Sequence, residues 1–428
     1  MSFTDLDYLE QEFIHFAKEN TRSDANQAEQ VPTTPGQKKM ALELVDLLKS
    51  YGLRAHYNPA SGFCISKVPG NVDNPKVTPF GIVAHVDTAD FSAVNIQPQV
   101  HRNYDGQKIV LNEQEQIVLD PAEFPALKQL QGQTLITGSG TTLLGVDDKA
   151  GVVGLLGAIK YLVEHPEVKH GDIYIGFGPD EEIGLGGTRF DPNDFPDAEF
   201  AYTLDNGQPG ELQYETFNAS EAKIHIRGTL VHPGNAYGLM VDATKLMTDF
   251  LSQLPADQSP EQTKDKEGFY MVVSASSNVD HADVDLIIRD FDWDKFTARE
   301  QFIKDLVAKL NQKYGEDRFS LQLDRTYLNI ANFVRKLPYV VNLAMDAYKK
   351  VGLTPQPKPF RGGTDGNFIS EKGIPTPNLF NGGGNYHGRY EYITVEQIDK
   401  LAETLVRIAH EHVLQSENGR NETPLPAD

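Results

Sequence analysis

Apolar residues follow two spacings along the first half of the chain, and stretches with one spacing alternate with stretches of the other. Spacings of three and four residues predict helices at 7–20, 36–53 and 152–163. Nearly unbroken apolar runs predict buried strands at 77–87, 172–184 and 200–207. Because strands that alternate with helices form largely parallel sheets covered on both faces, we expect a doubly wound α/β domain.

The pattern changes after residue 211. Six elements are predicted there, in the order strand, helix, strand, strand, helix, strand, at 222–228, 242–254, 268–276, 282–291, 294–315 and 318–323. This βαββαβ order is typical of an α+β split-βαβ, ferredoxin-like sandwich. We therefore predict a domain at 212–327 that is inserted into a first domain made of residues 1–211 and 328–428.

The first domain is expected to resume after the insertion. Its sheet should continue through segments 337–353 and 361–383, and a final helix is predicted at 395–414. The polar residues 415–428 are predicted to be a disordered tail.

Composition and charge exclude several classes of protein. The 428 residues include 39 basic and 61 acidic side chains, a net charge of -22 that repels nucleic acid and anionic lipid surfaces. No apolar run approaches the roughly 20 residues needed to span a bilayer, and the acidic N-terminus does not resemble a secretory signal. The single cysteine, Cys64, excludes an internal disulfide framework, so we expect a cytoplasmic protein.

Acids and imidazoles follow directly after four of the predicted elements, and one more histidine lies in a glycine-rich loop. They are His85 with Asp87, Asp147 with Asp148, Glu181 with Glu182, Asp205, and His387. Any one of these pairs alone is more often a solvated turn or helix cap. In a doubly wound sheet, however, these positions map to one rim, where several carboxylates would repel one another unless a cation neutralised them.

The types of these residues predict the cation. Imidazoles and carboxylates without a thiolate suit zinc, cobalt or manganese better than calcium. The number of acids predicts two ions that share one carboxylate and hold a water for attack on a carbonyl, which is hydrolytic chemistry.

The neighbouring acids and histidines are expected to differ in role. Glu181 and Glu182 leave a strand in different directions, so one can bind metal while the other handles protons. Asp87 can hold the second ring nitrogen of His85. His232 lies in a His-Pro-Gly loop of the inserted domain that could overhang the site. Histidines in or beside the predicted surface helices are expected to be surface residues: His15, His56, His165, His170, His410 and His412.

The order of the motifs adds a resemblance to a known family. The motifs "HVDT", "LLGVDDKAG", "PDEEIG", "VHPGNAYG", "IIRDFD" and "RGGTDG", around an inserted split-βαβ domain, resemble the peptidase T family. These tripeptide aminopeptidases belong to the co-catalytic zinc peptidase group, which includes aminoacylases and glutamate carboxypeptidases. The resemblance extends from "VPTTPGQ" to the final helix.

The resemblance implies a role for each candidate residue. One zinc is expected on His85 and Asp205, the second on Glu182 and His387, with Asp147 as the bridge and Asp148 outside the ligand set. Glu181 matches the general base, Asp87 the residue that supports His85, and His232 the histidine that stabilises the oxyanion, commonly across a dimer interface. Arg289 and Arg361 match anchors for the peptide carboxylate.

The resulting prediction is a cytoplasmic metallo-aminopeptidase of peptide catabolism that hydrolyses the N-terminal peptide bond of tripeptides with a water bridging two zinc ions. Co²⁺ or Mn²⁺ could substitute for zinc. The predicted domains are then a catalytic di-zinc domain and a lid or dimerisation domain, which allows a homodimer. Two alternatives stay open: a dipeptidase or N-acyl-amino-acid deacylase of the same zinc group, and a catalytically silent peptide-binding protein. The role of segment 21–37 is also open.

Overall fold

The computed structural model describes residues 2–205, 207–315 and 317–426. The chain divides into two compact units. The first contains the chain up to Tyr214, with Phe333–Lys358 and Thr364–Leu425, and the second contains Glu215–Asn332 with Pro359–Gly363. The sequence places the insertion at 212–327, so the short segment 359–363 is an addition to the second unit that the pattern did not indicate.

An eight-stranded sheet forms the centre of the first unit, in the order β1-β2-β8-β3-β9-β16-β10-β15. The strands are β1 (Ala55–Tyr57), β2 (Cys64–Val68), β3 (Phe80–His85), β8 (Ile173–Gly178), β9 (Phe200–Thr203), β10 (Glu211–Gln213), β15 (Gln356–Pro357) and β16 (Asn378–Leu379). The central strands β8, β3, β9 and β16 are parallel, whereas β1, β2 and β10 introduce antiparallel pairs toward the edges.

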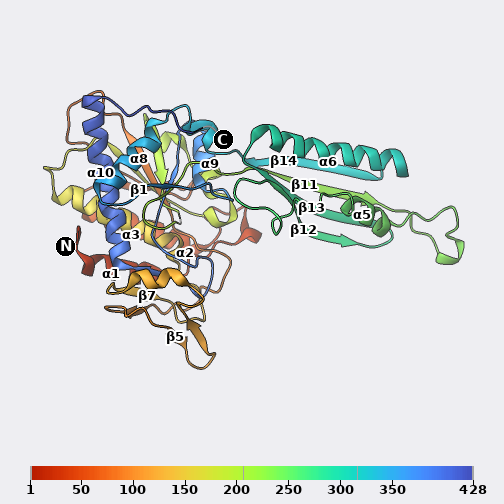
Figure 1. Cartoon of the computed structure of the whole chain (residues 1–428), viewed down its shortest axis with the longest axis horizontal. Coiled ribbons are helices and arrows are strands. Elements are labelled where there is room, and N and C mark those ends of the chain that lie inside the picture. The colour runs from red at the N-terminus through yellow and green to blue at the C-terminus, as the bar shows by residue number, and fades with distance from the viewer. Residues whose placement is uncertain (1, 206, 316, 427–428) are drawn as a thin grey trace. The chain divides into compact units, whose positions relative to one another are not determined.

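Helices cover both faces of this sheet. They are α1 (Leu6–Ala17), α2 (Pro35–Ser50), α3 (Val146–Glu164), α4 (Gly186–Arg189), α8 (Tyr339–Lys350), α9 (Asp365–Glu371) and α10 (Val395–Asn418). Along the chain, α7 (Ala331–Val334) contains the boundary between the second unit and the first. Figure 1 shows α1, α3 and α10 side by side, while α9 packs on the other face through Ile369. No helix among the described residues is both long and apolar enough to cross a membrane.

Two predictions for the last third of the first unit are wrong. Segment 337–353 is the helix α8 and not part of the sheet, and only β16 of segment 361–383 is a strand. The described part of the expected disordered tail is instead held in place: α10 continues to Asn418, and the Asn342 side-chain amide donates to the carbonyls of Asn421 and Thr423 at 2.9 and 2.8 Å. Residues 427 and 428 lie outside the described residues.

A small β-rich region between β3 and α3 was not predicted. It contains β4 (Gln99–His101), β5 (Ile109–Asn112), β6 (Ile117–Leu119) and β7 (Leu135–Thr137), and β7 also pairs with β17 (Tyr392–Thr394). These strands have three or four residues each, too few to show a period against their polar flanks.

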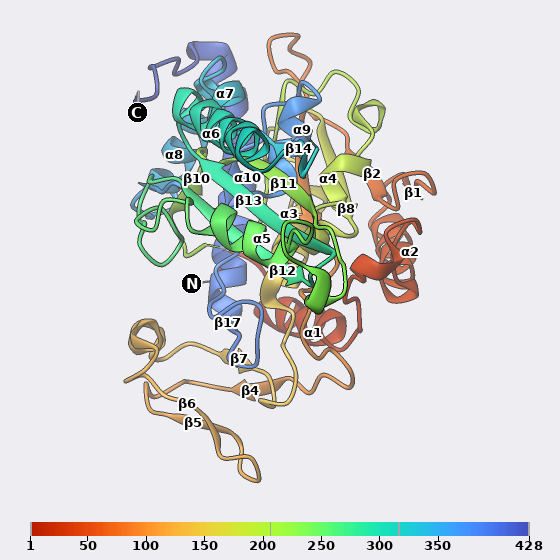
Figure 2. The same cartoon turned by 90° about the vertical axis from the view of Figure 1, so that its right-hand side faces the viewer.

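The second unit has the predicted βαββαβ order. Its elements are β11 (Asn218–Arg227), α5 (Ala243–Leu251), β12 (Phe269–Ser277), β13 (His281–Asp290), α6 (Trp293–Tyr314) and β14 (Phe319–Tyr327). The antiparallel sheet has the order β12-β13-β11-β14, and the helices pack on the face that carries Ala222, Ile224 and Ile226 (Figures 1 and 2). The predicted fold class, a doubly wound α/β domain with an inserted split-βαβ domain, is therefore confirmed.

Candidate active site

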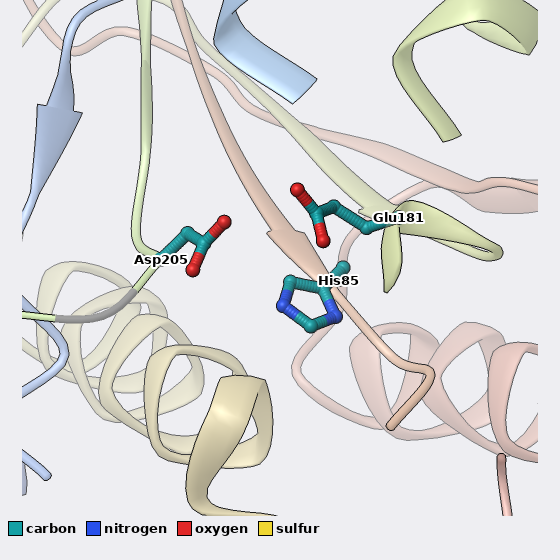
Figure 3. Close-up of side chains that lie close together, drawn as sticks. All are labelled: His85, Glu181 and Asp205. Atoms are coloured by element: carbon teal, nitrogen blue, oxygen red, sulfur yellow. The ribbon is translucent and has the colours of Figure 1, made fainter. Parts of the chain in front are cut away.

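The carboxyl ends of the central parallel strands bring the candidate residues together. β3 ends at His85, which is in register with Gly178 at the end of β8, and Glu181 follows three residues later. Asp205 follows β9 on the other side of β3. Figure 3 shows the His85 ring and the carboxylates of Glu181 and Asp205 turned toward a common space.

The Asp147 carboxylate lies between two imidazoles. Its Oδ1 is 3.0 Å from Nε2 of His85, and its Oδ2 is 3.2 Å from Nε2 of His387. Glu182 Oε2 is also 3.2 Å from the same nitrogen of His387. The two imidazoles thus share one carboxylate, and helix α3 begins its regular turns only after Asp148.

Asp87 and Asp148 hold the end of β3. The Asp87 carboxylate is 3.3 Å from Nδ1 of His85, whose ring also lies 3.2 Å from the Asp87 carbonyl oxygen. The same carboxylate accepts hydrogen bonds from the backbone N–H groups of Glu181 and Glu182 at 3.0 and 3.1 Å. Asp148 accepts from the His85 backbone N–H at 3.3 Å, so it faces the strand and not the imidazole.

The donor set fits a divalent cation. Two groups have donor atoms within 4.8 Å of one another: His85 with Glu181 and Asp205, and His85 with Asp147 and Glu182. Oε1 of Glu182 is buried and has no hydrogen-bond partner among the described residues, as expected for an oxygen whose partner is an ion. Nitrogen and carboxylate oxygen donors without sulfur suit zinc, cobalt or manganese.

Electrostatics point the same way. Burial, reinforced by the charge of Asp147, raises the pKa of Asp205 to about 8, and burial also raises the pKa values of Glu181 and Glu182. Burial alone would lower the pKa of His85, but hydrogen bonds to Asp147 and Asp87 raise it well above its usual range. A bound cation would replace these protons as the counter-charge of the crowded acids.

Comparison with known proteins places the chain in a family. Residues 140–411 match the family model described as peptidase family M20/M25/M40. The chain belongs to this family. A curated protein named peptidase T, from Fusobacterium nucleatum subsp. nucleatum, is 46% identical over 400 residues, which cover 94% of this chain and 96% of the relative.

Solved structures of M20 peptidases share the fold. The structure described as aminopeptidase PepT from Bacillus cereus has a TM-score of 0.75 at 22% identity and covers 96% of this chain and 99% of its own. One described as a dinuclear metal binding peptidase from Bacillus subtilis has a TM-score of 0.66 at 14% identity, covering 96% and 100%. The predicted resemblance is confirmed, and the chain has the fold of a family that contains dinuclear metal peptidases.

Two buried acids of this M20 chain were missed by the sequence reasoning. Glu391 accepts hydrogen bonds from the backbone N–H groups of Leu144, Gly145 and His387 at 2.8, 2.6 and 2.9 Å, so it joins the approach to α3 to the loop of His387. Asp365 accepts from Gly187 N–H at 2.5 Å, and within the described part of the chain its buried Oδ2 has no partner. The motif "RGGTDG" could have indicated Asp365, whereas no signal marks Glu391.

The predicted substrate-binding residues of the second unit contact groups of their own unit. His232 is exposed, and its Nδ1 accepts the N–H of Gly234 at 3.1 Å. Arg289 donates through Nη1 to the carbonyls of Ser220 and Ile288 at 3.1 and 2.9 Å.

Arg361 is held by a loop of its own unit. Its Nη1 donates to the carbonyls of Asp265 and Glu267 at 2.9 Å each, and its Nη2 donates to Thr263 Oγ1 at 2.9 Å. The roles expected of His232, Arg289 and Arg361 therefore stay predictions.

The surface assignment of the remaining histidines is wrong for two of the six. His412 is 0% exposed and His170 is 3% exposed. His412 is buried because it lies on the face of α10 that meets Phe80 and Phe200.

Proposed function

We propose that this M20 peptidase is a metallo-aminopeptidase that releases the N-terminal residue of tripeptides. The observation that carries the proposal is the buried Asp147 carboxylate shared by two imidazoles, with Glu181 and Glu182 beside it. The 46% sequence identity to a protein named peptidase T, over 94% of this chain, supports the tripeptide substrate.

The proposed metal ions are zinc. His85 and Asp205 would hold one ion, Glu182 and His387 the other, and Asp147 both. Metal ions bound there would polarise the scissile carbonyl and bring the pKa of a bound water close to neutrality. The support from this chain is the donor set, the burial of His85, Asp147 and Asp205, and the Glu182 oxygen that has no hydrogen-bond partner among the described residues.

Glu181 is the proposed general base, which takes the proton of the attacking water and gives it to the departing amine. Burial raises the pKa of this carboxyl, a direction that suits a group that must first accept and then release a proton. Asp87 orients His85 and holds the Glu181 backbone at the same time.

His232 is proposed to stabilise the oxyanion, and Arg289 and Arg361 to anchor the carboxylate of the tripeptide. A carboxylate anchor at a set distance from the reacting carbonyl would explain a preference for three residues. Dimerisation through the inserted domain and a cytoplasmic location also stay proposals.

The test measures hydrolysis of free peptides of two to five residues, an amidated tripeptide and an N-acetyl amino acid, together with metal content. The expected result is two ions per chain and the highest kcat/KM for the free tripeptide, with release of the N-terminal residue. Preference for the acetylated compound would favour the deacylase, and preference for the dipeptide the dipeptidase. No turnover by the metal-loaded protein would leave the peptide-binding alternative.

A further inference from the structure

Segment 21–37, whose role the sequence left open, lies against the carboxyl ends of two central strands. Arg22 forms a parallel bridge with Thr88, three residues after β3 ends. The Ser23 N–H donates to the Thr88 carbonyl at 3.4 Å. The start of the segment is thus tied to the turn that follows His85.

Residues at the end of the segment form hydrogen bonds with one buried acid, Asp180, which is 0% exposed. These contacts are called the grip on Asp180. The Asp180 carboxylate accepts hydrogen bonds from Thr33 N–H at 3.0 Å, from Gln37 Nε2 at 2.7 Å, and from the Thr33 hydroxyl. Arg189 pairs with the same carboxylate, and its Nη2 donates to the Ala28 carbonyl at 2.5 Å. The Gln37 amide also accepts the Asp180 N–H at 2.9 Å, so it fixes the backbone and the side chain of Asp180 together.

Asp180 immediately precedes the two glutamates of the site. Its φ of 61° is left-handed, and its carbonyl accepts the N–H groups of Leu185 and Gly186 at 2.9 and 3.0 Å. A left-handed conformation at a residue other than glycine persists only where the surroundings hold it. The turn that presents Glu181 and Glu182 therefore depends on the grip on Asp180.

Two opposing sets of contacts thus define this turn. Asp87 holds the backbone N–H groups of Glu181 and Glu182, and segment 21–37 holds the residue before them. The two ends of the segment lie against each other, because a Cβ at Gly36 would lie 1.9 Å from the carbonyl oxygen of Asn20, the residue before the segment.

We propose that Asp180 is a positioning residue for Glu181 and Glu182, and that Thr33, Gln37 and Arg189 act through it. Segment 21–37 is then a brace for the active site. The roles of the two glutamates rest on the proposed function, whereas the brace itself rests on the contacts of Asp180. Loss of the grip would let the turn move, so both proton transfer by Glu181 and metal retention by Glu182 should suffer.

The test compares matched variants of the zinc-loaded full chain. Asp180→Asn keeps the shape but removes the charge that Arg189 and Thr33 face. Thr33→Val replaces the hydroxyl with a methyl group, whereas Thr33→Ser keeps the hydroxyl. Asp24→Asn is the control, since it makes the same chemical change in the same segment at an acid that caps its own turn, accepting from Asn26 N–H at 2.9 Å.

Three quantities are measured for each variant: kcat and KM on a free tripeptide, the rate of zinc loss to a chelator, and the thermal midpoint. Asp180→Asn should lower kcat by about 10- to 100-fold with KM within about twofold, and should speed zinc loss about tenfold, the range typical of residues that support metal ligands. Thr33→Val should show a smaller change in the same direction, while Thr33→Ser and Asp24→Asn should behave like the wild type.

If Asp180→Asn has the kcat and the rate of zinc loss of the wild type, the proposal that the segment is a brace is overturned, whatever the thermal midpoint. Impairment of Thr33→Ser equal to that of Thr33→Val would also overturn it, because the hydroxyl would then not matter. If the wild type hydrolyses no tripeptide, the proposed function fails, and the rates of zinc loss still decide whether Asp180 holds the turn.

Discussion

A buried histidine lies at each end of strand β3, His85 in the strand itself and His412 in helix α10, and their surroundings differ. At the carboxyl end, the His85 ring contacts Asp147 and Asp87. At the amino end, His412 lies between the Tyr339 hydroxyl and the Thr78 carbonyl, each 2.8 Å from a ring nitrogen. Because a carbonyl can only accept, Nε2 of His412 donates to Thr78 and Nδ1 accepts from Tyr339, which satisfies a neutral ring completely.

The charges nearby differ in the same way. Beside His412, Arg420 pairs with Glu199 at 2.7 Å, one cation for one anion. At the other end acids are in excess, and buried oxygens of Glu182 and Asp365 find no partner in the part of the chain that the structure describes. Burial of a histidine is therefore no mark of an active site by itself. Uncompensated acids around a histidine are the feature that indicates a cation.

Asp147→Ala should have the largest effect, because it removes a carboxylate that both imidazoles contact. We expect loss of bound metal and a fall in kcat/KM well beyond the roughly 10- to 100-fold that follows loss of a supporting residue. Metal analysis after gel filtration and a tripeptide assay check it. Full metal occupancy in this variant would show that Asp147 is no bridge.

Glu181→Ala should separate proton transfer from metal binding. A general base contributes about 10²- to 10⁴-fold, so kcat should fall by that factor while the metal stays bound. Donor atoms of Glu181, His85 and Asp205 lie within 4.8 Å of one another, so Glu181 could itself bind metal, and metal content is the decisive measurement. Equal metal loss in Glu181→Ala and Asp147→Ala would mean that the ligand and the base have been misassigned.

Metal removal should destabilise the first unit, because the crowded carboxylates then lose their counter-charge. A ligand at about 100 times its Kd stabilises a folded protein by about 2.7 kcal/mol, so a chelator should lower the thermal midpoint by several degrees. Scanning calorimetry with and without chelator measures this difference. The Asp147→Ala variant is the control: its midpoint should not respond to the chelator, and a full response there would contradict a metal origin.

The contrast between the two ends also explains what the sequence could predict. His85, Asp87, Glu181 and Asp205 follow unbroken apolar runs, and such runs deliver their last residues to a known edge of the sheet. The fold class was predictable for the same reason, since long elements show their period clearly.

Residues that act through distant partners could not be found in this way. Asp180 depends on Thr33 and Gln37, which lie 147 and 143 residues away in the chain, and His412 depends on a carbonyl 334 residues away. No local pattern marks such pairs. For Arg289 and Arg361 the opposite holds: their motifs are visible in the sequence, but the sequence did not indicate their partners in the structure, which are backbone carbonyls and the Thr263 hydroxyl.

Protonation of His412, at the amino end of β3, should lower the stability of the fold and leave catalysis unchanged. Burial lowers the pKa of His412 to about 4, whereas an unfolded histidine titrates near 6.5. The unfolded chain therefore binds more protons between these values, so stability is fully present above about pH 6.5 and is lost as the pH falls toward 4. Each tenfold difference in proton affinity is worth about 1.4 kcal/mol, which gives a loss of about 3 kcal/mol across this range.

His412→Gln should remove this part of the pH dependence, because glutamine can still donate to Thr78 but does not titrate. The free energy of unfolding, measured by urea titration at several pH values, should lose that slope, while kcat on a tripeptide at neutral pH stays within about twofold of the wild type. His410→Gln is the matched control on the same helix, where the ring is only partly buried, and its slope should persist. A slope that survives in His412→Gln would assign the acid sensitivity to other groups, and a large loss of kcat would show that the two ends of β3 are not independent.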